Sequence, residues 1–143
     1  MSTITVVIAS YQYGHLAAHC IESVLCQSRK PDKILFVDDG STDQTLEQIK
    51  ELATLDNKVK YIEFSRNFGH QNAIKAGLDA STADVIIMMD CDLQHPPILI
   101  RELLSHYELG YDVVRTRRVE NESAGFIKRK TSNLFYKFLN QLS

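Results

Sequence analysis

Residues 4–9 read ITVVIA, a run rich in β-branched side chains in which every residue except Thr5 is apolar. Such a run is typical of a strand that is buried on both faces, as in a parallel sheet covered by helices. A polar turn at residues 10–14 follows, and residues 15–26 then place apolar side chains at helical spacing. The stretch therefore predicts the first strand–turn–helix unit of an α/β fold.

The same alternation of strand and helix continues along the chain. Ser41 and Gln44 have the spacing of a capping box, which predicts a helix start at Ser41. This alternation favours a mostly parallel central sheet with helices on both faces. Further strands are expected at residues 33–37, 59–64, 84–89 and 113–115, and further helices from residue 41, at 71–80, at 96–110 and at 126–142.

Length and composition favour a single globular domain. The 143 residues are 44% hydrophobic and 24% charged, which is ordinary for a soluble domain. The sequence shows no apolar run of the roughly 18 residues that a transmembrane helix needs. It also shows no basic and apolar leader at its start, so we expect a cytoplasmic protein.

Charge is distributed unevenly. The formal net charge of −2 argues against a nucleic-acid partner. Residues 111–143 nevertheless hold seven basic and three acidic residues, which indicates either an anionic partner near that segment or a solvated basic helix. Residues 126–142 combine basic side chains with an apolar stripe, so peripheral contact with the inner face of a membrane is a further hypothesis, beside simple packing on the sheet.

The cysteines predict a reducing compartment. Cys20, Cys26 and Cys91 are an odd number and show no spacing typical of metal ligands. We therefore expect all three to be small buried hydrophobic residues.

Polar residues follow each predicted strand. Because open α/β sheets bind ligands beyond the carboxyl ends of their strands, these residues predict a binding site at one edge. The clusters are Ser10–Gly14, Asp38–Asp43, Ser65–His70, Asp90–Pro97 and the arginines Arg115, Arg117 and Arg118.

Asp90 and Asp92 are the clearest candidates for chemistry. Residues two apart in an extended segment point to the same side, so their carboxylates would converge while Cys91 faces away. Two anions converge favourably only around a cation, and hard oxygen ligands suit Mg²⁺ or Mn²⁺. The alternative is that one aspartate caps the following helix while the other is solvated.

Asp38 and Asp39 form a second acidic cluster. One carboxylate could accept hydrogen bonds from a nucleobase or a ribose, and the other could support the turn. A simple strand–turn–helix connection is the alternative, because Asp, Gly and Ser are common turn residues.

Several nucleotide-binding and hydrolase motifs are missing from the sequence. It contains no GxGxxG, no GxxxxGK[ST], no GxSxG and no HExxH. Receiver domains and haloacid-dehalogenase phosphatases need their acidic pair after the first strand, where this chain has Ser10 and Tyr11.

Together these clusters resemble family 2 glycosyltransferases of the GT-A fold. The resemblance covers essentially the whole chain and rests on Val37–Ser41 and the Asp90-x-Asp92 pair. Residues 65–70, SRNFGH, and residues 92–97, DLQHPP, look like the branch that includes dolichol-phosphate mannosyltransferase and bacterial polyprenyl-phosphate glycosyltransferases. The resemblance implies a Rossmann-like nucleotide-binding half and an inverting, metal-dependent transfer from a nucleoside-diphosphate sugar to a lipid phosphate or glycan.

The resemblance also implies roles for individual residues. Asp90 and Asp92 would be catalytic, with Asp90 facing the ribose and phosphates of the donor. Asp92 and Gln94, with Asp90, would hold Mg²⁺ or Mn²⁺. The base pocket would be lined by Ala9, Tyr11 and Asp39, and the other substrate-binding candidates are Asp38, Arg66, Arg118 and Arg129.

Two features depart from the family pattern. Gln12 stands where the family usually has Asn, so we assign Gln12 no role. Relatives also continue past residues 126–142, so we expect residues 1–110 to bind the nucleotide sugar and 111–143 to begin an incomplete acceptor-side part. A non-catalytic nucleotide-sugar-binding or interaction module is the alternative, and the sequence leaves assembly into a homo-oligomer open.

Overall fold

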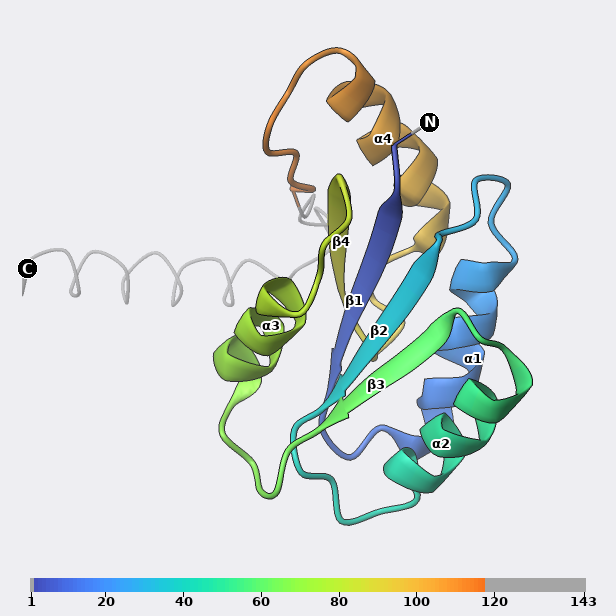
Figure 1. Ribbon diagram of the computed structural model, residues 1–143, viewed down its shortest axis with the longest axis vertical. Helices are drawn as coiled ribbons and strands as arrows, with labels where there is room; N and C mark the ends of the chain where they lie inside the picture. The colour runs from blue at the N-terminus through green and yellow to red at the C-terminus, as the bar shows by residue number, and fades with distance from the viewer. Residues whose placement is uncertain (1, 118–143) are drawn as a thin grey trace, which may run out of the picture. The chain divides into compact units, whose positions relative to one another are not determined.

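Four parallel strands form one sheet within residues 2–117, the part of the chain that the computed structural model describes (Figure 1). Ala9 in the central strand lies opposite both Val37 and Asp90, so the carboxyl ends of neighbouring strands meet at one edge. The expected parallel sheet is confirmed. Its order is β3-β2-β1-β4, with β1 at Ile4–Ser10, β2 at Lys33–Asp38, β3 at Val59–Glu63 and β4 at Val85–Asp90.

Helices cover both faces of this sheet. Figure 1 shows α3 on one side and α1 and α2 on the other. Ile100 and Leu104 of α4 belong to the same apolar cluster as α1 and α2. The helices are α1 at Gly14–Leu25, α2 at Thr45–Leu55, α3 at His70–Asp79 and α4 at Ile100–Glu108, with the short 3₁₀ helix η1 at Pro97–Leu99 before α4.

The two faces explain why β1 is mostly apolar, with Thr5 and Ser10 as its buried polar residues. Val6 and Ile8 pack into the cluster that includes α1, α2 and α4, whereas Val7 and Ala9 pack into the cluster that includes α3. Successive side chains alternate between the faces of a strand, so a strand covered on both sides favours apolar residues on both faces. Every residue of this strand is buried, and the first exposed side chain after it is Tyr11.

The chain divides into two compact units, Met1–Asp112 and Val113–Ser143. The structure describes residues 113–117 of the second unit, and they form neither strand nor helix. The expected strand at 113–115 is therefore wrong. Its two valines lead directly into arginines, and Val113 is 85% exposed, so this segment has no apolar face to bury. The expected helix at 126–142 lies outside the described residues.

Two local predictions also need correction. The helix expected from Ser41 begins at Thr45, because Asp43 rather than Ser41 accepts the hydrogen bond from the Thr45 backbone N–H (3.0 Å). Cys20 and Cys91 are buried as expected, but Cys26 is exposed. It follows the last residue of α1 and so lies outside the buried stripe of that helix.

Candidate functional site at the carboxyl edge of the sheet

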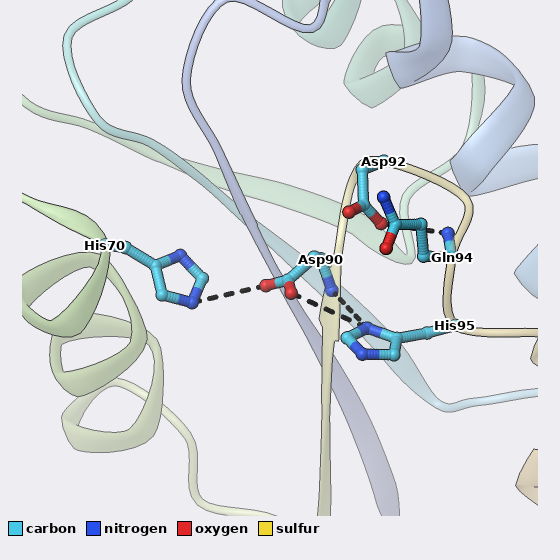
Figure 2. A network of polar contacts seen from close by, with 5 residues as sticks. All are labelled: His70, Asp90, Asp92, Gln94 and His95. Carbon is cyan, nitrogen blue, oxygen red and sulfur yellow. Dashed lines mark hydrogen bonds and ion pairs between the residues drawn. The ribbon is translucent and has the colours of Figure 1, made fainter. Parts of the chain in front are cut away.

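The end of β4 presents the first acidic pair. Cys91 is buried in the core, and the flanking Asp90 and Asp92 are partly exposed, as the alternation along an extended segment predicts. Figure 2 shows both carboxylates, with Gln94, at this end of the strand. The sequence prediction that Cys91 turns away from the two aspartates is confirmed.

A tight turn holds Asp92 in place. Leu93 adopts a φ of 60°, a left-handed conformation that is uncommon for a residue other than glycine. The backbone N–H of Gln94 donates a hydrogen bond to Asp92 Oδ1 (2.9 Å). This turn returns the chain over the end of β4, and it brings Asp92 and Gln94 into one loop with Asp90 (Figure 2).

Two histidines flank Asp90. His70, the first residue of α3, places Nε2 3.3 Å from Asp90 Oδ1. His95 accepts a hydrogen bond at Nδ1 from the backbone N–H of Asp90 (3.1 Å), and the same Nδ1 lies 3.8 Å from Asp90 Oδ2. Three separate segments, β4, α3 and the loop after β4, therefore meet at this carboxylate.

The core beneath this loop contains a pair of thiols. A side-chain hydrogen bond with Cys91, together with burial, raises the pKa of the Cys20 thiol. Cys20 therefore stays protonated and acts as part of the apolar cluster between α1 and the sheet.

The acidic pair at the end of β2 has a different environment. Asp39 is only 2% exposed and accepts hydrogen bonds from the backbone N–H groups of Phe68 (Oδ1, 2.7 Å) and Gly69 (Oδ2, 3.0 Å). Asp38 is also buried. Its Oδ2 accepts a hydrogen bond from the Ser41 N–H (3.1 Å), and its Oδ1 has no hydrogen-bond partner within the described part of the chain. Both oxygens of Asp39 thus hold the loop that leads into α3.

The loop after β1 is tied to the loop after β2. Gln12 has a φ of 58°, and its backbone N–H donates to Ser41 Oγ (2.8 Å). Gly14 at the start of α1 donates its N–H to Asp43 Oδ2 (3.1 Å). Burial opposes ionisation of Asp43, but hydrogen bonds from Thr45 and Gly14 outweigh burial and lower the pKa of this carboxyl group.

Arg66 lies in the loop after β3. Its guanidinium stacks 4.2 Å from the centre of the Phe68 ring, which holds the side chain against its own loop. Gly40 packs against the Arg66 backbone so closely that an added Cβ would lie 2.3 Å from it, and Gly40 has a φ of 71°. The loops after β2 and β3 are therefore in direct contact.

The remaining candidates are divided between surface, core and the undescribed region. Tyr11 is 41% exposed, whereas Ala9 is buried in the cluster with α3. Arg118 and Arg129 lie outside the described residues, so their roles stay predictions. The sequence analysis named His70 and Asp43 only as the last residues of two polar clusters and gave neither a role. Their positions close to the starts of α3 and α2 were the available signals.

Residues 2–117 contain neither a preformed metal cluster nor a membrane-spanning helix. No group of three or more His, Cys, Asp or Glu side chains there comes together as a ready metal site. Nor does that part of the chain contain a helix that combines the length and the apolar character needed to cross a membrane.

The fold agrees with comparisons to known proteins. Residues 5–143 match the model of glycosyl transferase family 2, and the chain belongs to that family. A solved mannosyltransferase, PcManGT from Pyrobaculum calidifontis in complex with GDP-Man and Mn²⁺, has a similar fold. Its TM-score is 0.58 at 21% identity, covering 64% of this chain and 28% of that one.

Curated relatives are closer in sequence. The chain is 40% identical over 141 residues to the putative glycosyltransferase CsbB of Bacillus subtilis (strain 168), covering 96% of this chain and 43% of that relative. It is 42% identical over 111 residues to the prophage bactoprenol glucosyl transferase homolog of Escherichia coli (strain K12), covering 78% of this chain and 36% of that relative. The chain thus spans about two fifths of the length of these relatives.

Proposed function

We propose that this chain forms the donor-binding part of a glycosyltransferase. The transferase would move a sugar from a nucleoside-diphosphate sugar to a polyprenyl phosphate, in cell-envelope or surface-polysaccharide biosynthesis. The observation that carries the proposal is the loop of Asp90, Asp92 and Gln94 at the carboxyl end of β4, in a chain of glycosyl transferase family 2. The GDP-Man in the related structure supports such a donor, and the bactoprenol relatives support such an acceptor.

The oxygen atoms that the side chains of this loop offer as metal ligands fit Mg²⁺ or Mn²⁺. Mg²⁺ characteristically takes one or two protein carboxylates and completes its shell with water and substrate phosphates, so a cluster of three acidic residues is not required. Asp92 and Gln94 would hold the cation, with Asp90 beside them, and the Mn²⁺ in the related structure supports this assignment. When bound, the cation would act as a Lewis acid that offsets charge on the departing diphosphate.

The other residues of the edge would bind and orient the donor. Asp90 would face the ribose and phosphates. The base would lie over the loop after β1, near Tyr11 and Ala9, with Asp39 acting by holding the loop that leads into α3. The basic side chains of Arg66, Arg118 and Arg129 would attract the phosphates of donor or acceptor.

The acceptor limits what acid–base chemistry is needed. A lipid phosphate is already anionic near pH 7, so its oxygen needs less help from a general base than a sugar hydroxyl would. Inversion at the anomeric carbon follows from direct attack by that oxygen. We place the reaction at the inner face of the membrane, where a cytoplasmic donor and a lipid-phosphate acceptor would meet.

A thermal-shift panel tests the proposal. UDP, GDP and their hexose conjugates would each be added with and without Mn²⁺, because a ligand that binds only the folded state raises its stability by mass action. At one hundred times the dissociation constant this stabilisation is about 2.7 kcal/mol. We expect one nucleotide series to stabilise the protein only when Mn²⁺ is present, and no stabilisation by either series would contradict the proposal.

Release of nucleoside diphosphate then separates the two functional hypotheses. With the matching nucleotide sugar and a polyprenyl phosphate, an active transferase releases the diphosphate. Binding without release would favour the non-catalytic nucleotide-sugar-binding module.

A further inference from the structure

The two histidines beside Asp90 cannot act on it in the same way. His95 Nδ1 accepts the hydrogen bond from the Asp90 backbone N–H at 3.1 Å, so this nitrogen carries no proton while the bond is made. Asp90 Oδ2, 3.8 Å from the same nitrogen, therefore faces a lone pair rather than a donor. His95 fixes the backbone of Asp90 and gives its carboxylate no favourable partner.

His70 approaches Asp90 from the opposite side. Its Nε2 lies 3.3 Å from Oδ1, and Figure 2 shows the imidazole of α3 directed at that oxygen. A carboxylate oxygen and an unprotonated imidazole nitrogen repel each other at this distance, whereas an N–H at Nε2 makes the contact attractive. The His70 and Asp90 side chains are 50% and 37% exposed, so the contact stands at the surface of the edge.

The backbone that carries His70 is fixed independently of Asp90. Phe68 and Gly69, immediately before α3, donate their backbone N–H groups to the buried carboxylate of Asp39. Gly69 has a φ of 97°, which turns the chain into α3 at His70. Asp39, which follows β2, thus fixes the position of the His70 backbone and so helps to place the His70 imidazole near Asp90.

We propose that His70 is a positioning residue for Asp90, directing its Nε2–H at Oδ1 so that Oδ2 is left for the donor and its cation. This inference rests on the proposed function, since it assigns Asp90 to the donor side of the site. His70 acts through Asp90 and does not itself touch the substrate. A carboxylate whose rotation is fixed before binding loses less conformational freedom when the ligand arrives.

The proton position is the first test. Long-range ¹⁵N–¹H spectra of the ¹⁵N-labelled protein report which nitrogen of each imidazole carries a proton. We expect a proton on His70 Nε2 and none on His95 Nδ1. A His70 ring protonated only at Nδ1 would overturn the proposal, because Nε2 would then present a lone pair to Asp90.

The second test separates positioning from mere packing. His70→Leu removes the N–H, whereas His70→Gln retains an amide N–H close to the position of Nε2. By calorimetry with UDP and with GDP, each with Mn²⁺, we expect His70→Leu to weaken whichever nucleotide binds by about tenfold. The affinity of His70→Gln should stay within about threefold of that of the original chain. The difference is expected because His70→Leu loses a hydrogen bond to a charged group and His70→Gln retains it.

His19→Leu is the matched control, because His19 is an exposed histidine on α1, and thermal unfolding of each variant checks the fold. Equal affinities for the original chain and His70→Leu would overturn the positioning role while leaving the proposed function intact. A failure of His70→Gln to restore binding would also overturn it. An original chain that binds neither nucleotide with Mn²⁺ would instead contradict the proposed function.

Discussion

Two acidic pairs stand at the same edge of the sheet, and their environments are opposite. Asp38 and Asp39 at the end of β2 are 1% and 2% exposed, and three of their four oxygens accept backbone hydrogen bonds. Asp90 and Asp92 at the end of β4 are partly exposed, and Asp90 contacts the side chains of His70 and His95. The same residue type therefore holds loops in place in one pair and is partly exposed to solvent in the other.

Burial rather than sequence spacing separates the pairs. Strand β2 lies between β3 and β1, and the loops after β1 and β3 cover its end. Its two carboxylates are buried as a result. β4 has no strand on its other side within residues 2–117, so its end is less covered. The comparison predicts that substitutions at β2 change stability and that substitutions at β4 change ligand affinity.

Replacement of Asp39 should have the largest effect. Asp39→Ala leaves the N–H groups of Phe68 and Gly69 without their acceptor, and each hydrogen bond to a charged group contributes about 1.5–3 kcal/mol. We expect the free energy of unfolding to fall by about 4 kcal/mol in urea denaturation. Asp92→Ala, the matched change at β4, removes one solvent-exposed hydrogen bond from the Gln94 N–H and should cost about 1 kcal/mol or less. Equal losses of unfolding free energy in the two variants would contradict the proposed difference between the two acidic pairs.

Gly40 tests the contact between the loops after β2 and β3. Gly40→Ala places a Cβ 2.3 Å from the Arg66 backbone, in a residue with a φ of 71°. Overpacking and left-handed strain each cost about 1–3 kcal/mol, so we expect a loss of about 3 kcal/mol in the same denaturation experiment. Gly110→Ala is the control, because Gly110 has a φ of 96° but nothing within 4 Å of an added Cβ. A loss no larger than that of the control would show that the loops do not touch closely.

Asp43 tests the link between the starts of α1 and α2, and its effect depends on pH. Its pKa is lowered from 3.8 in the folded chain, so its ionised form stabilises the fold. That stabilisation is present above the unfolded pKa and is lost as pH falls through the lower folded pKa. Asp43→Ala should cost about 1 kcal/mol at pH 7, as for loss of a helix cap, and less at pH 3. A cost that stayed constant between pH 7 and pH 3 would contradict this account.

The sequence predicted the strands correctly where the apolar run was long. The four strands of the described sheet begin and end within one residue of the expected positions, because β1, β2 and β4 are predominantly apolar runs and β3 ends at a polar turn. The segment at 113–115 had only two valines and failed as a strand. The start of α2 was misplaced because Ser41 binds the Gln12 N–H instead of capping the helix.

The site was predictable in outline but not in its division of roles. Alternation along β4 correctly set Cys91 apart from Asp90 and Asp92. Sequence could not show which carboxylate of the β2 pair would be fully engaged by the chain, because Phe68 and Gly69 come from a loop 29 and 30 residues away. His70 received no role for the same reason, since only the packing of α3 against β1 and β2 brings its ring to Asp90.

The most direct measurement is calorimetry of Mn²⁺ and the matching nucleoside diphosphate with Asp92→Asn, which keeps the shape of the side chain and removes its charge. Asp79→Asn at the far end of α3 is the control for loss of an exposed carboxylate. We predict at least a tenfold loss of Mn²⁺-dependent affinity for Asp92→Asn, about 1.4 kcal/mol, and none for the control. Unchanged affinity in Asp92→Asn would contradict the claim that this loop binds the donor through a divalent cation.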